Sequence, residues 1–103
     1  MNPIIQSKYQ QIIEICEKYK VKRLILFGSV VSGGFNQEHS DLDFLVDFHS
    51  MTPGEHAEAY FSILFDLEHI FQVPIDLIER ETIKNPYLLE SIEVNIEVIY
   101  EAA

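Results

Sequence analysis

The 103-residue sequence predicts an α/β (α+β) fold, in which helices cover a small mixed β-sheet. Helical and strand patterns alternate along the chain in the order helix, strand, strand, helix, strand, helix, strand. No internal repeat and no flexible linker divides this pattern, and the length suits one modest hydrophobic core. We therefore expect a single domain that spans residues 1–103.

The first half of the chain predicts one helix and two strands. Between residues 3 and 20 apolar side chains recur every three or four positions, which indicates an amphipathic helix. Residues 21–27, "VKRLILF", form a β-rich run that stops at Gly28, as expected for a strand buried on both faces. A short helical turn and a polar loop should follow, before the alternating segment "DLDFLVDF" at residues 41–48 forms a second strand.

The second half predicts a long helix, a strand, a shorter helix and a last strand. Residues 56–72 carry apolar side chains at helical spacing, and "VPIDLIE" at residues 73–79 reads as a short strand. Asn85 and Pro86 suit the start of a helix that runs to about Val94. For "IEVIY" at residues 96–100 the pattern favours an edge strand over a continuing helix. The aromatic stripe of the long helix is predicted to be mainly core: Tyr60, Phe61, Phe65 and Phe71.

Composition limits the kinds of partner. Seventeen acidic against seven basic residues give a net charge of −10, which repels a phosphate backbone and argues against direct binding of nucleic acid. The same charge suits divalent cations or a basic protein. No apolar run is long enough to span a membrane and the N-terminus does not resemble a signal peptide, so we expect a cytoplasmic protein with no membrane contact.

Gly28 and Ser29 directly follow the first strand and precede a short helical segment. Backbone N–H groups and a serine hydroxyl in that position can surround a phosphate, and glycine lets the backbone approach closely. Taken alone, the pair is weak evidence, because Gly-Ser after a strand is an ordinary turn in most sequences.

Three aspartates supply the second candidate feature. Asp41 and Asp43 share one face of the second strand, and two neighbouring carboxylates favour a bridging cation. Asp76 stands between apolar residues in the third strand, where a carboxylate should need a partner such as a metal. An isolated pair of this kind can also be a charged strand edge that prevents aggregation. The four histidines show no metal-like spacing and are predicted to be structural or solvated.

The segments "LFGS", "SDLDFLVDF" and "VPIDLI" occur in the order and context typical of one superfamily. Together they resemble the polymerase-beta-like nucleotidyltransferases, whose signature is a strand, Gly-Ser, a loop, two spaced aspartates and a third aspartate on a later strand. Over almost its whole length the chain is similar to the minimal nucleotidyltransferases. Many of these are MNT-domain antitoxins of HEPN/MNT toxin–antitoxin pairs. The resemblance implies a polymerase-beta-like nucleotidyltransferase core.

The resemblance also implies roles for individual residues. Asp41 and Asp43 would hold two Mg²⁺ ions, for which Mn²⁺ can substitute, and Asp76 would complete the catalytic metal site. Gly28 and Ser29 would bind the β- and γ-phosphates of ATP. Asp76 would help to deprotonate the acceptor hydroxyl, which attacks the α-phosphorus and expels pyrophosphate.

Two departures from the family pattern concern the loop between these motifs. Eleven residues separate Ser29 from Asp41, one more than is common, and Gly33-Gly34 could absorb the extra residue. Val30 stands where the family often has arginine, which removes a cation that could meet a triphosphate. This departure predicts weaker nucleotide affinity.

The leading functional prediction is transfer of AMP from ATP to a hydroxyl, which the resemblance identifies with a tyrosine of a cognate HEPN ribonuclease toxin. The chain would then be the antitoxin of that toxin. The alternative is a non-catalytic acidic module that masks a basic partner. A small-molecule adenylyltransferase is less favoured because a second substrate-binding domain is missing. Homo-oligomers and hetero-oligomers both remain open.

Overall fold

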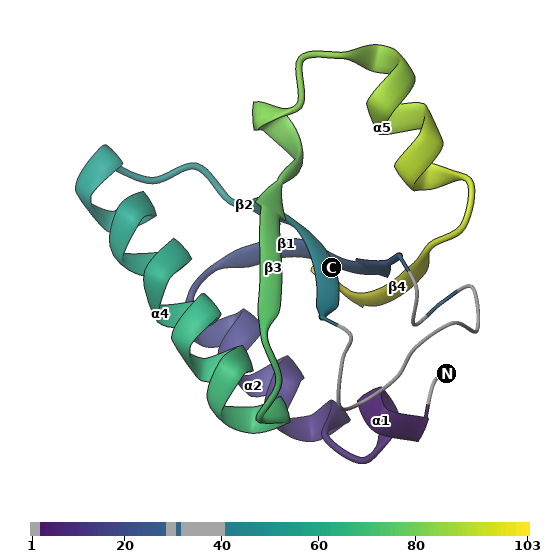
Figure 1. Cartoon of the computed structure of the whole chain (residues 1–103). Helices are drawn as coiled ribbons and strands as arrows, with labels where there is room; N and C mark the ends of the chain where they lie inside the picture. Colours follow the sequence, from purple (N-terminus) through teal and green to yellow (C-terminus); the bar gives the residue numbers. More distant parts are fainter. Residues whose placement is uncertain (1–2, 29–30, 32–40) are drawn as a thin grey trace.

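A four-stranded mixed sheet forms the centre of the computed structural model, which describes residues 3–28, 31 and 41–103. Its strands are β1 (Val21–Phe27), β2 (Leu42–Phe48), β3 (Ile75–Glu79) and β4 (Glu97–Glu101). They lie in the order β3-β2-β1-β4, and β1 is antiparallel to both of its neighbours, whereas β2 and β3 are parallel (Figure 1). The predicted mixed sheet and its four strands are confirmed.

The described helices are α1 (Pro3–Gln6), α2 (Tyr9–Lys18), α4 (Pro53–Phe71), the 3₁₀ turn η1 (Arg80–Thr82) and α5 (Pro86–Glu93). The prediction of one continuous helix over residues 3–20 was wrong, since α1 ends before α2 begins. The Ser7 hydroxyl donates to the Ile4 carbonyl at 2.9 Å, and such a side-chain bond competes with continuation of the helix. Of the helical turn and loop expected after Gly28, all but Val31 lies outside the described residues, including Gly33-Gly34.

The long helix α4 begins three residues before its predicted start at His56. Thr52 and Glu55 form a capping box, in which the Glu55 amide donates to the Thr52 hydroxyl and the Thr52 amide donates to the Glu55 carboxylate. Pro53 occupies the first helical position, where its missing N–H costs nothing. The helix ends at Gln72, which adopts a left-handed conformation.

One face of the sheet carries the hydrophobic core. Helices α1, α2 and α4 lie together on this face, and α5 stands apart from them (Figure 1). The fully or nearly fully buried core side chains from helices are Ile5, Ile12, Cys16, Ile63, Leu67 and Phe71. Those from strands are Val21, Leu24, Leu26, Leu42, Phe44, Val46, Leu77 and Ile99. None of the described helices is both long and apolar enough to cross a membrane.

The prediction that the aromatic stripe of α4 is core was wrong for two of its members. Phe71 is buried, but Phe61 and Phe65 are 65% and 69% exposed. Ile63 and Leu67 are fully buried on the face of α4 that meets the sheet, and Phe61 and Phe65 point away from that face.

The packing of α4 predicts a sharp contrast between two substitutions. Ile63→Ala removes a fully buried side chain and should lower the free energy of unfolding by about 2–5 kcal/mol. Phe65→Ala, half a turn further along the same helix, removes an exposed side chain and should change it by no more than about 0.5 kcal/mol. Urea denaturation followed by circular dichroism measures both values. Equal losses for the two variants would contradict the assigned orientation of α4.

Candidate active site

The parallel pairing of β2 and β3 brings two of the predicted aspartates together. In this register Asp43 lies directly beside Asp76 on the neighbouring strand. Adjacent strands are about 4.8 Å apart and paired residues point to the same face, so the two carboxylates are neighbours. Asp41 immediately precedes β2 and lies two residues before Asp43, on the same face. The three aspartates therefore gather at one end of the β2–β3 pair.

The electrostatics of this group reflect that proximity. The pKa of Asp43 is raised, first by partial burial of its carboxyl and then by the negative charges of Asp76 and Asp41. Asp41 and Asp76 are themselves exposed to solvent. Among the residues that the structure describes, no basic side chain forms an ion pair with any of the three. A divalent cation would relieve this repulsion.

Asp76 is exposed, which corrects the prediction from the sequence that its carboxylate is buried among apolar residues. Its apolar neighbours suggested a buried carboxylate, but β3 is the edge strand of the sheet and Asp76 is exposed. Leu77 turns towards the core instead and is 5% exposed. The feature that sets Asp76 apart is its position beside Asp43, not burial.

Gly28, directly after β1, lies against Asp43 on the side opposite Asp76. It adopts a φ of 82°, a left-handed conformation that favours glycine. A Cβ atom built on Gly28 would overlap the Oδ2 atom of Asp43 and lie 3.1 Å from its Cγ. The backbone turns here, since the Val31 amide donates to the Gly28 carbonyl at 3.2 Å. The absent side chain thus lets the turn lie against the Asp43 carboxylate. The predicted phosphate ligand Ser29 lies outside the described residues.

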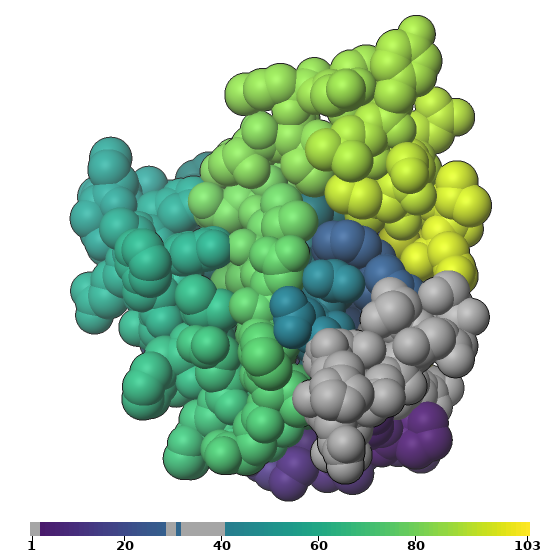
Figure 2. Space-filling view, viewed as in Figure 1, coloured from purple at the N-terminus to yellow at the C-terminus, as the bar shows by residue number. Residues whose placement is uncertain are grey.

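The surface beside Gly28 is hollowed. A cavity of about 290 Å³ is lined by Phe27 and Gly28 from β1 and its end, and by Ser91, Ile92 and Asn95 from α5 and the residues after it. In Figure 2 the blue and teal surface of the first two strands lies in a recess, which the green and yellow surface of the second half of the chain borders. A ligand group in this cavity would lie next to the turn that contacts Asp43.

Tyr60 holds β3 in place behind the site. Its hydroxyl donates to the Leu77 carbonyl at 2.6 Å and so ties α4 to the edge strand, one residue after Asp76. Burial raises the pKa of Tyr60, and the carboxylates of Glu79 and Asp76 raise it further. Sequence reasoning counted Tyr60 only as part of an aromatic stripe. Its contact with a strand fifteen or more residues later leaves no local signal in the sequence.

A match to a known protein family identifies the family of this chain. The family described as "Nucleotidyltransferase domain" matches residues 9–99, which include Gly28 and all three aspartates. The chain belongs to this nucleotidyltransferase family. The predicted family resemblance and the predicted enzyme class are thereby confirmed.

Relatives and solved structures agree with that assignment. Two candidate protein adenylyltransferases of Methanocaldococcus jannaschii are 37% and 36% identical to this nucleotidyltransferase, and each alignment covers 89% of this chain and 88% of the relative. A solved candidate minimal nucleotidyltransferase is 26% identical, with a TM-score of 0.66 and 90% of each chain covered.

Two further solved structures support the fold alone. One is a chain of a toxin–antitoxin complex with AMP-PNP, 18% identical, with a TM-score of 0.69 over 91% of this nucleotidyltransferase and 73% of that chain. The other belongs to a complex of a tri-AMPylated Shewanella oneidensis HEPN toxin with its MNT antitoxin. It is 17% identical, with a TM-score of 0.64 over 94% of this chain and 72% of that one. The predicted α+β nucleotidyltransferase fold is confirmed.

The raised pKa of Asp43 predicts a pH-dependent effect of Asp43→Asn on stability. Because the folded state holds this proton more tightly than the unfolded state, ionisation costs stability as pH rises above the ordinary value of 3.8 and through the raised pKa. Without cations, Asp43→Asn should therefore be more stable than the wild type at pH 7. The gain should vanish below pH 3.8, where both states of the wild type are protonated. Urea denaturation in a chelating buffer across this range measures the difference.

Asp47→Asn is the matched control for this experiment. Asp47 lies on the same strand and face as Asp43, but its pairing partner on β1 is Arg23. A cationic residue and not a second carboxylate stands opposite Asp47, so this variant should not gain stability at pH 7. A gain for Asp43→Asn that does not change with pH would contradict ionisation of the Asp43 carboxylate as its cause.

The close approach of Gly28 to Asp43 predicts that this position tolerates only glycine. Gly28→Ala should lower the free energy of unfolding by at least about 1 kcal/mol, because a left-handed conformation and an overlap with Asp43 both oppose the methyl group. The control is Gly54→Ala in the first turn of α4, where a Cβ meets no atom within 4 Å. That variant should be neutral or gain up to about 1 kcal/mol. Thermal unfolding compares the two, and equal stability would refute the crowded arrangement.

Proposed function

We propose that this nucleotidyltransferase transfers AMP from ATP to a hydroxyl group of a protein, and that the acceptor is a tyrosine of a cognate HEPN ribonuclease toxin. The chain would then act as the antitoxin, with residues 1–103 working as one domain. The observation that carries this proposal is the convergence of Asp43, Asp76 and Asp41 beside Gly28 in a chain of this family.

The residue types of the aspartate group suit divalent metal ions. Its three carboxylates supply the oxygen donors that Mg²⁺ prefers, and a cation between them would offset the partial burial and the neighbouring negative charges that raise the pKa of Asp43. Asp41 and Asp43 would hold two Mg²⁺ ions, or Mn²⁺ in their place, and Asp76 would complete the catalytic metal site. Bound there, the ions would supply charge neutralisation for the triphosphate and lower the pKa of the acceptor hydroxyl.

The chain's own residues would position and move the reacting groups. The backbone at Gly28 and the Ser29 hydroxyl would donate hydrogen bonds to the β- and γ-phosphates. The Asp76 carboxylate, which is exposed and next to Asp43, would accept the proton of the acceptor hydroxyl. That oxygen would attack the α-phosphorus in line. A new O–P bond would form while the bond from the α-phosphorus to the bridging oxygen breaks, and pyrophosphate would leave.

The relatives and the charge support a protein acceptor. The M. jannaschii relatives are named as candidate protein adenylyltransferases, and two structural neighbours come from toxin–antitoxin complexes. A net charge of −10 suits a hetero-oligomer with a basic protein and disfavours direct contact with nucleic acid. We place the reaction in the cytoplasm, where ATP and a cellular ribonuclease meet.

The same net charge also favours a second candidate function. A small acidic domain could neutralise a basic toxin by covering its active surface, with the aspartates acting only through charge complementarity. The two functions differ in what happens to the toxin, because masking leaves its mass unchanged.

The proposal predicts a covalent change in the toxin. Incubation of the partner with ATP, Mg²⁺ and this protein should add the mass of one or more AMP groups at a tyrosine, as intact-mass and peptide mass spectrometry measure. Asp41→Asn combined with Asp43→Asn should reduce the rate at least about 100-fold, because it removes two of the three carboxylates that would hold the metal ions. The core-facing residues of β2 are unchanged in this variant, so it should still fold.

Asp47→Asn serves as the control on the same strand and should retain activity. Growth rescue separates the two candidate functions. If the double variant protects cells as well as the wild type and no AMP is ever found on the toxin, masking by an acidic surface replaces the enzymatic proposal.

A further inference from the structure

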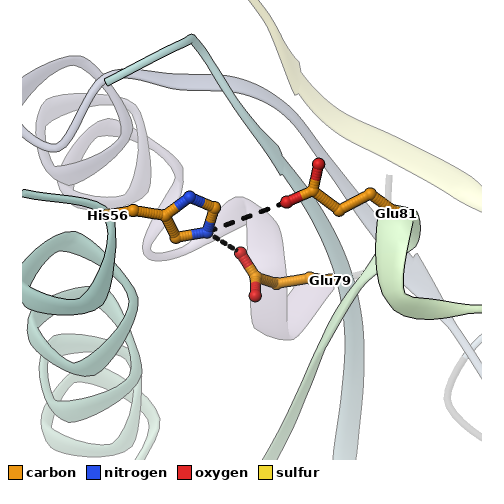
Figure 3. A group of neighbouring side chains, drawn as sticks. All are labelled: His56, Glu79 and Glu81. Atoms are coloured by element: carbon orange, nitrogen blue, oxygen red, sulfur yellow. Dashed lines mark hydrogen bonds and ion pairs between the residues drawn. The ribbon is translucent and has the colours of Figure 1, made fainter. Parts of the chain in front are cut away.

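A second group of metal-ligating side chains lies away from the aspartates. His56 comes from the first turns of α4, Glu79 is the last residue of β3, and Glu81 belongs to the turn η1. Figure 3 shows the imidazole pointing towards both carboxylates, and one donor atom from each residue lies within 4.8 Å of the other two. Sequence reasoning gave His56 no role, because its two partners lie more than twenty residues further along the chain.

The geometry of the three donors suits a single ion. His56 Nε2 contacts Glu79 Oε1 directly and lies 3.9 Å from Glu81 Oε1. Donors bound to one zinc ion at about 2.0–2.2 Å lie roughly 3.3–3.6 Å apart in a tetrahedral site. The Glu81 side chain is 69% exposed and can close the small remaining gap. Binding of an ion would replace the direct contact between His56 and Glu79, so these two side chains would rotate apart to the separation that two zinc ligands require.

The surrounding structure fixes two of the donors. The capping box of α4 sets the first turn of the helix, and the His56 ring packs against the Phe48 ring with 5.2 Å between centroids. Glu79 is held where β3 pairs with Val46 of β2. The side chains of His56 and Glu79 are 30% and 19% exposed, so they are partly ordered by packing yet open to solvent. A cavity of about 530 Å³ borders both residues and gives an ion access to them.

Two basic side chains close in sequence to these glutamates have other partners. Arg80, between the two glutamates in sequence, binds Glu93 with 3.1 Å between Nε and Oε1. Lys84 donates to the backbone carbonyl of Glu81, not to its carboxylate. The two carboxylates thus keep a net negative charge next to an imidazole nitrogen, in a chain of net charge −10. This environment favours a divalent cation.

We propose that His56, Glu79 and Glu81 form a second cation site, which binds a divalent transition metal such as Zn²⁺. One imidazole nitrogen with two carboxylates is a common zinc donor set, and the nitrogen favours transition metals over Mg²⁺. Three protein donors leave one position of a tetrahedral site for water.

The site is separate from the proposed catalytic one. Glu79 lies three residues after Asp76 on β3, which is about 10 Å along the strand and places the two side chains on opposite faces. Loss of zinc binding can therefore be distinguished from loss of nucleotidyl transfer, which depends on the aspartates.

The test is direct measurement of metal binding in a host that lacks the catalytic carboxylates. Asp41→Asn, Asp43→Asn and Asp76→Asn are combined, and the metal-free protein is titrated with Zn²⁺ by calorimetry and with Co²⁺ by visible absorption. We expect one ion to bind per chain, with a Co²⁺ spectrum typical of nitrogen and oxygen donors at low coordination number. Adding His56→Gln should weaken Zn²⁺ binding at least about tenfold and abolish that spectrum.

Two further variants keep the result interpretable. Glu81→Gln changes a mostly exposed side chain and should also weaken binding without affecting the fold, which circular dichroism checks. His69→Gln, on the exposed last turn of the same helix, should bind like the host. The proposal is overturned if the host binds no Zn²⁺, or if His56→Gln and Glu81→Gln bind it as tightly as His69→Gln does.

Discussion

Strand β2 runs parallel to β3, in the register that sets Asp43 beside Asp76 and Val46 beside Glu79. Parallel neighbours cannot be joined by a tight turn, so a crossover connection is required, and α4 with its nineteen residues provides it. That helix in turn needs an apolar face to pack on the sheet and a firm start, which Ile63, Leu67 and the Thr52 capping box supply. Loss of this pairing would separate the carboxylates that the proposed chemistry needs. It would also separate His56 from Glu79 and Glu81, the three residues of the His56 group.

The pairing has an electrostatic cost, which the opposite face of the same strand offsets. Two like charges a few ångströms apart near a protein surface repel by about 1–4 kcal/mol. Leu42, Phe44 and Val46, which alternate with the aspartates along β2, are at most 1% exposed. Burying each such side chain contributes roughly 1.5–3 kcal/mol. The core side of β2 therefore outweighs the repulsion on its other side, and the strand stays in a register that its charges alone would disfavour.

The sequence predicted those parts of the molecule that depend on local patterns. The segments that form β1 and β2 and the Asn85-Pro86 start of α5 were all predicted correctly. Hydrophobic periodicity and helix capping depend on residues that are close together in the sequence. The break near Ser7 was missed because the apolar pattern continues through it, and the local bond from the Ser7 hydroxyl to the Ile4 carbonyl leaves no sign in that pattern. The pairing of Asp43 with Asp76 depends on strand order and register, which no single segment encodes. The His56 group was invisible for the same reason, since its members come from a helix, a strand and a turn.

Helix α4 not only connects β2 to β3 but also restrains β3 at the edge of the sheet. In the described sheet β3 pairs only with β2, so its outer side lacks a strand to hold it. Helix α4 supplies the missing restraint through the Tyr60 hydroxyl on the Leu77 carbonyl and through His56 on Glu79. These two contacts lie one and three residues after Asp76, on the face of β3 that is turned away from it. The helix can therefore fix the strand that carries Asp76 from behind, while the face that must admit a nucleotide and an acceptor stays open.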